Sequence, residues 1–139
     1  MIACLFCEIA AGTKPAHVVL ETPEVMAFLD IRPVFHGHCL LIPRVHVDTL
    51  DELPDPLIEP LFTEARRLSR AVRSALDAAG TFVAMNNRVS QSVPHLHVHV
   101  VPRRPKDGLR GFFWPRVKYG SEAQMADFRD RIREAVDGR

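Results

Sequence analysis

Apolar residues recur along the chain with a short period in some segments and a helical period in others. Val18 to Glu21 and Val25 to Leu29 are short apolar runs on either side of Thr22-Pro23-Glu24, which predicts two strands joined by a turn. Cys39 to Ile42, which ends at a proline, and Thr81 to Met85, which follows a glycine, predict two further buried strands.

Two segments carry the helical period. Apolar side chains recur at intervals of three and four from Pro56 to Ala79, which predicts one long amphipathic helix with arginine and glutamate on its outer face. Those apolar residues are Leu57, Leu61, Ala65, Leu68, Val72 and Leu76. Ser121 to Val136 predicts a second helix, with Glu122 near its start and arginines near its end, as the helix dipole favours. Short strands with tight turns plus two helices predict an α+β fold, an antiparallel sheet with helices on one face.

Three histidines alternate with aliphatic residues in the segment from His95 to Val101, which predicts a last strand. Successive side chains of a strand point to opposite faces, so His95, His97 and His99 would share one face. Three buried imidazoles in a row would each need hydrogen-bond partners, so a packing role is disfavoured. Histidine changes charge near neutral pH, and the run therefore indicates nucleophilic chemistry, acid–base chemistry or metal binding.

A metal held by the whole triad is disfavoured by distance. At a rise of about 3.3 Å per residue, His95 and His99 lie about 13 Å apart along a strand. Metal–nitrogen bonds are about 2.1 Å long, so one ion cannot take both outer histidines, although a neighbouring pair could share one. This favours a central reactive residue, His97, with a helper on either side. The preceding segment, Asn86 to Ser92, is rich in side chains that suit phosphate or amide oxygens.

Composition narrows the class of protein. The 139 residues suit one domain, and 18 basic against 17 acidic residues leave a net charge of +1, so we expect neither nucleic acid nor a membrane as partner. Neither a signal peptide nor a membrane-spanning run is recognisable. Three cysteines are an odd number, which disfavours a disulfide framework and favours a cytoplasmic location.

The run His95-Leu96-His97-Val98-His99-Val100-Val101 resembles the signature of the histidine triad (HIT) family of nucleotide hydrolases and transferases. The resemblance extends over nearly the whole chain. Its other elements are Cys4-Leu5-Phe6-Cys7, Phe28-Leu29-Asp30, Gly37-His38 with Leu40-Leu41-Ile42-Pro43, Asn86-Asn87 and Gln91-Ser92-Val93. It implies a HIT-like α+β fold, an antiparallel meander sheet with one long helix and a C-terminal helix, as a single histidine triad domain over residues 1–139.

The resemblance also implies a reaction. In the family the middle histidine attacks the α-phosphorus of a nucleotide, and water then hydrolyses the nucleotidyl-histidine intermediate; that role falls on His97. His99 would donate to a phosphoryl oxygen or to the leaving group, and His38 would line the same site. The implied substrates are purine nucleotide conjugates, either phosphoramidates, which are slightly favoured, or dinucleoside polyphosphates. The family also implies a homodimer in which two sheets join.

Further positions are assigned by the same resemblance. A carboxylate at Asp30 would hold the ribose hydroxyls. The side chains expected to line the purine pocket are Leu5, Phe6, Ile9, Phe28 and Ile31, and those expected to meet the phosphates are Asn86, Gln91 and Ser92.

The pair Cys4 and Cys7 is by itself a moderate signal, because structural zinc needs four ligands. Some bacterial members of the family resemble this chain here and use such a pair with two histidines, which correspond to His46 and His95. The resemblance therefore implies a structural zinc. Cys39 is expected to be buried without a metal, and His17 and His36 are expected on the surface or in loops.

One loop departs from the family pattern. Family members commonly have a glycine before the Gln-Ser pair and a longer loop, whereas this chain has only Arg88-Val89-Ser90 there, with Ser90 at the glycine position. A residue with a Cβ is costly at positive φ and blocks close backbone approach to phosphate. Arg88 would then supply charge that the loop does not.

Two alternatives stay open on sequence alone. A zinc-stabilised nucleotide-binding protein with little or no turnover is supported by the altered loop. A metal-dependent oxygenase would need a carboxylate close to a histidine pair, and none follows the triad. The aromatic run Phe112-Phe113-Trp114-Pro115 suits a dimer contact or a lid over the substrate better than simple core.

Overall fold

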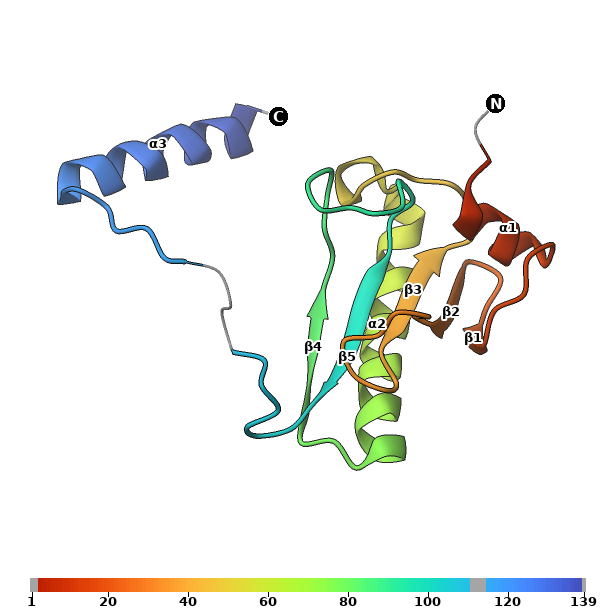
Figure 1. Ribbon diagram of the computed structural model, residues 1–139. Helices are drawn as coiled ribbons and strands as arrows, with labels where there is room; N and C mark the ends of the chain where they lie inside the picture. Colours follow the sequence, from red (N-terminus) through yellow and green to blue (C-terminus); the bar gives the residue numbers. More distant parts are fainter. Residues whose placement is uncertain (1–2, 111–114, 139) are drawn as a thin grey trace. The chain divides into compact units, whose positions relative to one another are not determined.

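A computed structural model describes residues 3–110 and 115–138, so the aromatic residues 112–114 lie outside the described part. Five strands form one antiparallel sheet in the order β1-β2-β3-β5-β4 (Figure 1). The strands are β1 (Val18–Glu21), β2 (Val25–Leu29), β3 (Cys39–Pro43), β4 (Gly80–Ala84) and β5 (Val98–Arg103). The first three follow one another as a meander, and β5 inserts between β3 and β4.

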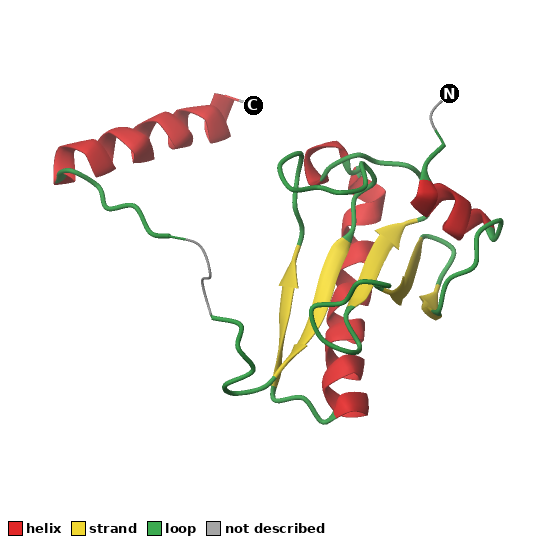
Figure 2. Ribbon diagram, viewed as in Figure 1, coloured by secondary structure: helices red, strands yellow, loops and turns green. Residues whose placement is uncertain are grey.

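The helices are α1 (Leu5–Ala11), η1 (Leu50–Glu52), α2 (Asp55–Leu76) and α3 (Glu122–Gly138), shown in red in Figure 2. The chain divides into two compact units, Met1–Asp107 and Gly108–Arg139, and α3 belongs to the second. The α+β class, the long helix and the C-terminal helix are therefore confirmed. Among the described residues, no helix combines the length and apolarity needed to span a bilayer.

Strand alternation divides the first unit into two apolar cores. Side chains at odd positions of β2 and β3 pack with α2, and those at even positions pack with α1. The odd set is Val25, Ala27, Cys39 and Leu41, and the even set is Met26, Phe28, Leu40 and Ile42. Leu40 lies directly opposite His99, and directly opposed residues share a face. The triad therefore faces the α1 side of the sheet, whereas α2 supports the other side.

The bounds of β1 and β2 match the sequence prediction, whereas the histidine strand is shorter than predicted. β5 begins at Val98, because the N–H groups of the preceding residues bond elsewhere than to β3 or β4. The N–H of His95 donates to Val93 O and that of Leu96 donates to Val47 O, 2.7 Å away. β5 also continues through Pro102. This residue pairs with β4 but lies beyond the last residue of β5 that pairs with β3, so its other side is an edge, where proline is tolerated.

Two helical features differ from the prediction. α2 ends at Leu76 rather than Ala79, because Asp77 adopts a left-handed conformation (φ 52°) and the N–H of Ala78 bonds back to Arg73 O. α1 has no counterpart in the sequence prediction and covers the sheet face opposite α2. A helix of seven residues is too short to be stable by itself, so its contacts with the sheet decide its formation.

Candidate active site and metal cluster

His97 is held in the form that a nucleophile requires. Its ring is buried, with 3% of its surface exposed, and its Nδ1 lies 2.8 Å from the backbone oxygen of His95. A carbonyl oxygen can only accept, so Nδ1 carries the proton and Nε2 of the neutral ring keeps its lone pair. The acceptor that fixes this tautomer is a backbone oxygen in the same segment of the chain, which no sequence pattern identifies.

His38 and His99 join His97 in one cluster, as predicted. Nε2 of His38 lies 2.9 Å from Nδ1 of His99, and the ring centroids of His97 and His99 are 5.0 Å apart. Burial is the main cause that lowers the pKa of His38, and it also lowers the pKa of His99 to about 4, with further contributions from the neighbouring histidines. Both rings are therefore uncharged at neutral pH.

Part of the predicted purine pocket lies against these histidines. The Phe6 ring meets the His97 ring edge to face at 5.1 Å between centroids and the Phe28 ring at 5.4 Å. Ile9 is buried in the same apolar cluster. Leu5 and Ile31 are more open, with 42% and 83% of their surfaces exposed, so they are not part of this packed wall and their place in a pocket stays a prediction.

Asp30 is close enough to the histidines to share a ligand with them. Its Oδ2 lies 3.7 Å from Nε2 of His38, and its Oδ1 accepts the N–H of Arg32 at 2.9 Å. The first distance is too long for a hydrogen bond but places a carboxylate at the border of the histidine cluster. The geometry is compatible with the ribose role expected for Asp30.

The predicted phosphate-binding loop uses its polar side chains to hold its own shape. Gln91 accepts the N–H of Arg88 at 2.9 Å and donates to Asp48 O at 2.6 Å, while Asn86 donates to Ser90 O at 3.2 Å. Ser92 is exposed. Gln91 and Asn86 therefore shape the loop, and the role predicted for them in binding phosphate stays a prediction.

The same loop contains two residues in the left-handed backbone region. Arg88 has φ 72° and Ser90 has φ 59°. Residues with a Cβ avoid this region, and each costs about 1 kcal/mol or more there. Ser90, which stands at the glycine position of the family pattern, thus has the positive φ angle that is costly for a residue with a Cβ.

The four predicted metal ligands converge beside the candidate active site. One ligand atom from each of Cys4, Cys7, His46 and His95 lies within 4.8 Å of all the others. Nδ1 of His95 is 3.4 Å from Sγ of Cys4 and 3.5 Å from Sγ of Cys7, and Nδ1 of His46 is 3.3 Å from Sγ of Cys7. Two sulfurs and two imidazoles are a donor set suited to tetrahedral zinc.

Second contacts orient both imidazoles for a metal. Nε2 of His95 lies 2.8 Å from the oxygen of Pro43, and Nε2 of His46 lies 2.6 Å from a carboxylate oxygen of Asp48. Each Nε2 therefore donates its proton outward, and each Nδ1 directs a lone pair at the cluster, as is usual for metal-bound histidines. Asp48 could have been suspected as a carboxylate two residues after His46, whereas the Pro43 carbonyl has no sequence signal.

The Cys7 thiol also needs a cation. Burial and the neighbouring Cys4 raise the pKa of Cys7 to about 11, so the thiolate forms at neutral pH only beside a positive charge. The cluster therefore fits zinc in donor type, lone-pair direction and charge. Cys39, as predicted, is buried apart from it, and His17 and His36 are exposed.

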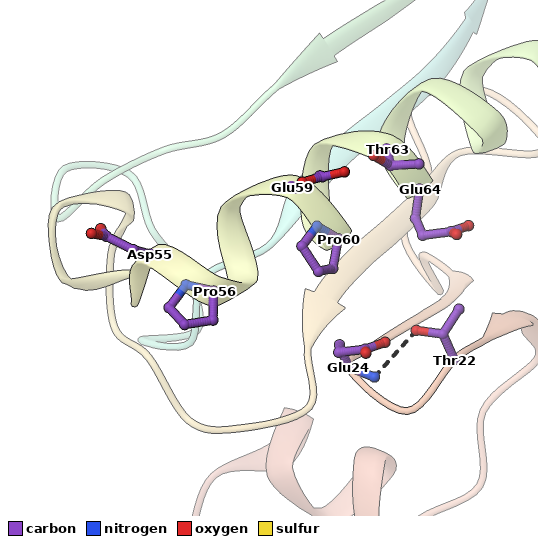
Figure 3. A pocket seen from close by; sticks show the side chains of 8 residues that line it. All are labelled: Thr22, Glu24, Asp55, Pro56, Glu59, Pro60, Thr63 and Glu64. Carbon is purple, nitrogen blue, oxygen red and sulfur yellow. Dashed lines mark hydrogen bonds between the residues drawn. The ribbon is translucent and has the colours of Figure 1, made fainter.

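The surface has hollows away from the histidines. One, of about 400 Å³, lies between the first turns of α2 and the turn joining β1 to β2 (Figure 3). Its lining includes four carboxylates, at Glu24, Asp55, Glu59 and Glu64. Such a lining repels phosphate, so this hollow is unsuited to a nucleotide.

Comparison with protein families and relatives gives a consistent result. The HIT domain family matches residues 11–106. The protein Hit of Bacillus subtilis is 38% identical over 113 residues, 80% of this chain and 78% of its own length. The adenosine 5'-monophosphoramidase HNT1 of Saccharomyces cerevisiae is 33% identical over 126 residues, 91% of this chain and 74% of its own.

Comparison with solved structures finds members of the same family. A HIT family member from Bacillus subtilis superposes with a TM-score of 0.86 at 32% identity and covers 96% of both chains. A zinc-bound histidine triad family protein from Mycobacterium smegmatis has a TM-score of 0.73 at 32% identity and covers 99% of this chain and 98% of its own.

Proposed function

The chain belongs to the HIT family, and from this premise we propose that it cleaves purine nucleotide conjugates at the α-phosphorus through a nucleotidyl-histidine. The observation that carries the proposal is the 2.8 Å contact from Nδ1 of His97 to the backbone of His95, which leaves Nε2 free to attack. The neighbouring His99 and Asp30 supply a hydrogen-bonding group and a carboxylate on the same border.

The proposed reaction has two displacements. Nε2 of His97 forms a bond to the α-phosphorus with its lone pair, while the bond to the leaving group breaks. The electron pair of that bond departs with the leaving group, and an amine leaving group takes up a proton from solvent. Nδ1 of His97 keeps its proton, and the His95 carbonyl stabilises the positive charge that develops on the ring. Water then forms a bond to phosphorus and releases a proton to solvent, the phosphorus–nitrogen bond breaks, and the electron pair returns to Nε2. The products are a nucleoside monophosphate and the free leaving group.

Zinc has a structural role in this proposal. Cys4, Cys7, His46 and His95 would hold it, and the ion would bind the start of α1 to the end of β3. When bound, the ion supplies positive charge that keeps both thiols ionised, and no reacting group is attached to it. Phe6 lies between the two cysteines, so the same attachment keeps the aromatic wall against His97.

Phosphoramidates are the preferred substrate class, supported by the similarity to the yeast phosphoramidase, and dinucleoside polyphosphates are the second. The test is hydrolysis of adenosine phosphoramidates and diadenosine polyphosphates by the wild type and by His97→Ala. The expected result is a kcat lowered by orders of magnitude in His97→Ala with nucleotide affinity nearly unchanged, because Asp30 and the apolar wall carry binding. His17→Ala, an exposed histidine, serves as the control and should keep wild-type rates.

The covalent step can be observed directly. Single-turnover reactions quenched at alkaline pH, where phosphorus–nitrogen bonds survive, should show one added nucleotidyl group that maps to His97. A wild-type rate in His97→Ala, or an adduct on another residue, would exclude the mechanism.

A second candidate function is nucleotide binding without turnover. It is favoured by one observation, the strained Arg88 and Ser90 backbone in the loop expected to meet the phosphates. This alternative predicts tight AMP binding by calorimetry together with no hydrolysis of either substrate class by zinc-loaded wild type.

A further inference from the structure

A chain of hydrogen bonds runs from the loop between β2 and β3 to His99. The N–H of Val34 lies 3.1 Å from Nδ1 of His38, and Nε2 of His38 lies 2.9 Å from Nδ1 of His99. A backbone N–H can only donate, so Nδ1 of His38 accepts and the single proton of its neutral ring sits on Nε2. That proton is donated to Nδ1 of His99, which places the proton of His99 on its own Nε2.

We propose that the Val34 amide, acting through His38, fixes the tautomer of His99 and keeps both rings neutral, so that His99 is a permanent Nε2–H donor. The inference rests on the proposed function for its catalytic meaning. It makes His38 a positioning residue and gives His99 a hydrogen-bonding role without proton transfer.

The proton count supports this assignment. A proton added to Nδ1 of His38 would face the N–H of Val34, and one added to Nδ1 of His99 would face the Nε2–H of His38. Loss of the Nε2 proton from either neutral ring would leave an imidazolate, which is not accessible near neutral pH. The pair therefore neither takes up nor passes on a proton in turnover. The lowered pKa values of both rings agree with this, even though Asp30 nearby acts in the opposite direction.

The same argument distinguishes a second cluster, Asp30, His38 and His99, from the cluster of predicted metal ligands. Ligand atoms of Asp30, His38 and His99 also lie within 4.8 Å of one another. A metal on Nε2 of His38 would require an imidazolate, because Nδ1 of that ring already accepts the Val34 N–H. At His46 and His95 the outer partner is an oxygen acceptor, and the nitrogen facing the cluster is unprotonated. Asp30, His38 and His99 are thus suited to hydrogen bonding and not to binding a metal.

The test reads the ring nitrogens by NMR on zinc-loaded protein labelled with ¹⁵N-histidine, without substrate. In the wild type we expect His99 to show a protonated Nε2 and an acceptor-type Nδ1 from pH 5.5 to 8.5, with no titration in that range. A protonated Nδ1, or a titration of His99 near pH 6.5, would overturn the proposal. Because this experiment needs no turnover, its outcome is independent of whether the proposed hydrolysis is correct.

Val34→Pro removes the backbone donor, and Val34→Ala is the matched control that keeps it. Val34→Pro should let the His99 tautomers mix and should lower kcat about tenfold, the value of one hydrogen bond, with KM nearly unchanged. Val34→Ala should match the wild type in both readouts. If the proline variant does not fold, His38→Leu should give the same mixing at His99. A fixed Nε2–H tautomer of His99 in a folded Val34→Pro or in His38→Leu would refute the role of the relay.

Discussion

His95 connects the two candidate sites within a single residue. Its ring nitrogen Nδ1 lies 3.4 Å from Sγ of Cys4, and its backbone oxygen accepts from Nδ1 of His97. The ring is fully buried, so it has little freedom to move without moving its own carbonyl. The position of the proposed nucleophile therefore depends on how the neighbouring imidazole is held.

Ser90 should be replaceable by glycine with a gain in stability. Its φ of 59° is unfavourable for a residue with a Cβ, so Ser90→Gly should raise the free energy of unfolding by up to about 1 kcal/mol. Denaturant unfolding measures the change. Val89→Gly is the control, because it alters the exposed neighbour in the same loop and should lower stability slightly. Equal effects of the two substitutions would contradict the strain argument.

Stability should fall as the pH falls below about 6.5, in part because of His99. The pKa of His99 is lowered to about 4 in the folded protein, while an unperturbed histidine titrates near 6.5. Between these values the unfolded chain takes up a proton that the folded chain does not, so folding loses about 1 kcal/mol per pH unit through this group. Chemical unfolding of zinc-loaded wild type and His99→Gln between pH 7.5 and 4.5 tests this. A slope equally steep in both proteins would rule out this contribution.

At the scale of elements, α1 is the one that depends most on attachments. It has only seven residues, and its C-terminal turn is held from outside by Arg44, which donates to Ala10 O at 3.1 Å and to Thr22 O at 2.7 Å. Its start carries Cys4 and Cys7, which zinc would attach to His46 and His95. Loss of either attachment should loosen one end of the helix, while Phe6 and Ile9 still pack on the sheet.

Removal of a cysteine ligand should therefore cost stability. Cys4→Ser should reduce the zinc content well below one ion per chain and lower Tm by roughly 5–10 °C, while some hydrolysis remains. Metal analysis and thermal unfolding measure both effects. Cys39→Ala, a cysteine buried in the other core, should keep its zinc. Wild-type protein purified without chelator and lacking zinc would contradict the metal assignment.

The elements differ in how far sequence predicts them, and the reason is physical. β1 and β2 are bounded by turn residues, which act locally, so their bounds are read from the chain. α1 depends on contacts with strands that are distant in sequence. The segment that contains His95 and His97 lies outside the regular pairing of β5, because the N–H of Leu96 donates to the distant carbonyl oxygen of Val47. Side chains of the site could be named from sequence, but the backbone groups that set their tautomers, at Val34, Pro43 and His95, could not.

At the scale of the whole molecule, one edge of the sheet and one side of α2 are suited to a second copy of the chain. β4 is an edge strand, and Ser69 of α2 contacts Thr81 of β4 at 2.7 Å between hydroxyl oxygens. Phe62, two turns before Ser69 on the same side of the helix, is 45% exposed. Exposed charges on α2 are acidic early, at Asp55 and Glu59, and basic later. The exposed basic residues are Arg66, Arg67, Arg70 and Arg73.

A homodimer should therefore form with two α2 helices antiparallel, since acidic and basic halves would then face each other. Sedimentation at micromolar concentration should show the dimer for wild type and monomer for Phe62→Asp. Val19→Asp, an exposed apolar residue on the opposite edge strand, should remain dimeric. A wild-type monomer would contradict the prediction.

That residues 1–139 act as a single functional domain also stays a prediction, since the family match ends at residue 106.

The division of β2 and β3 into odd and even positions has a consequence for how the protein can change. Odd positions pack against α2 and carry the scaffold, whereas even positions face α1 and the histidines. Substitutions on the even side therefore change the α1 core and the wall beside the histidines, whereas substitutions on the odd side change the α2 core. An inserted or deleted residue in either strand exchanges the two roles at once. Natural drift and laboratory selection should accordingly vary these strands in composition and leave their length unchanged.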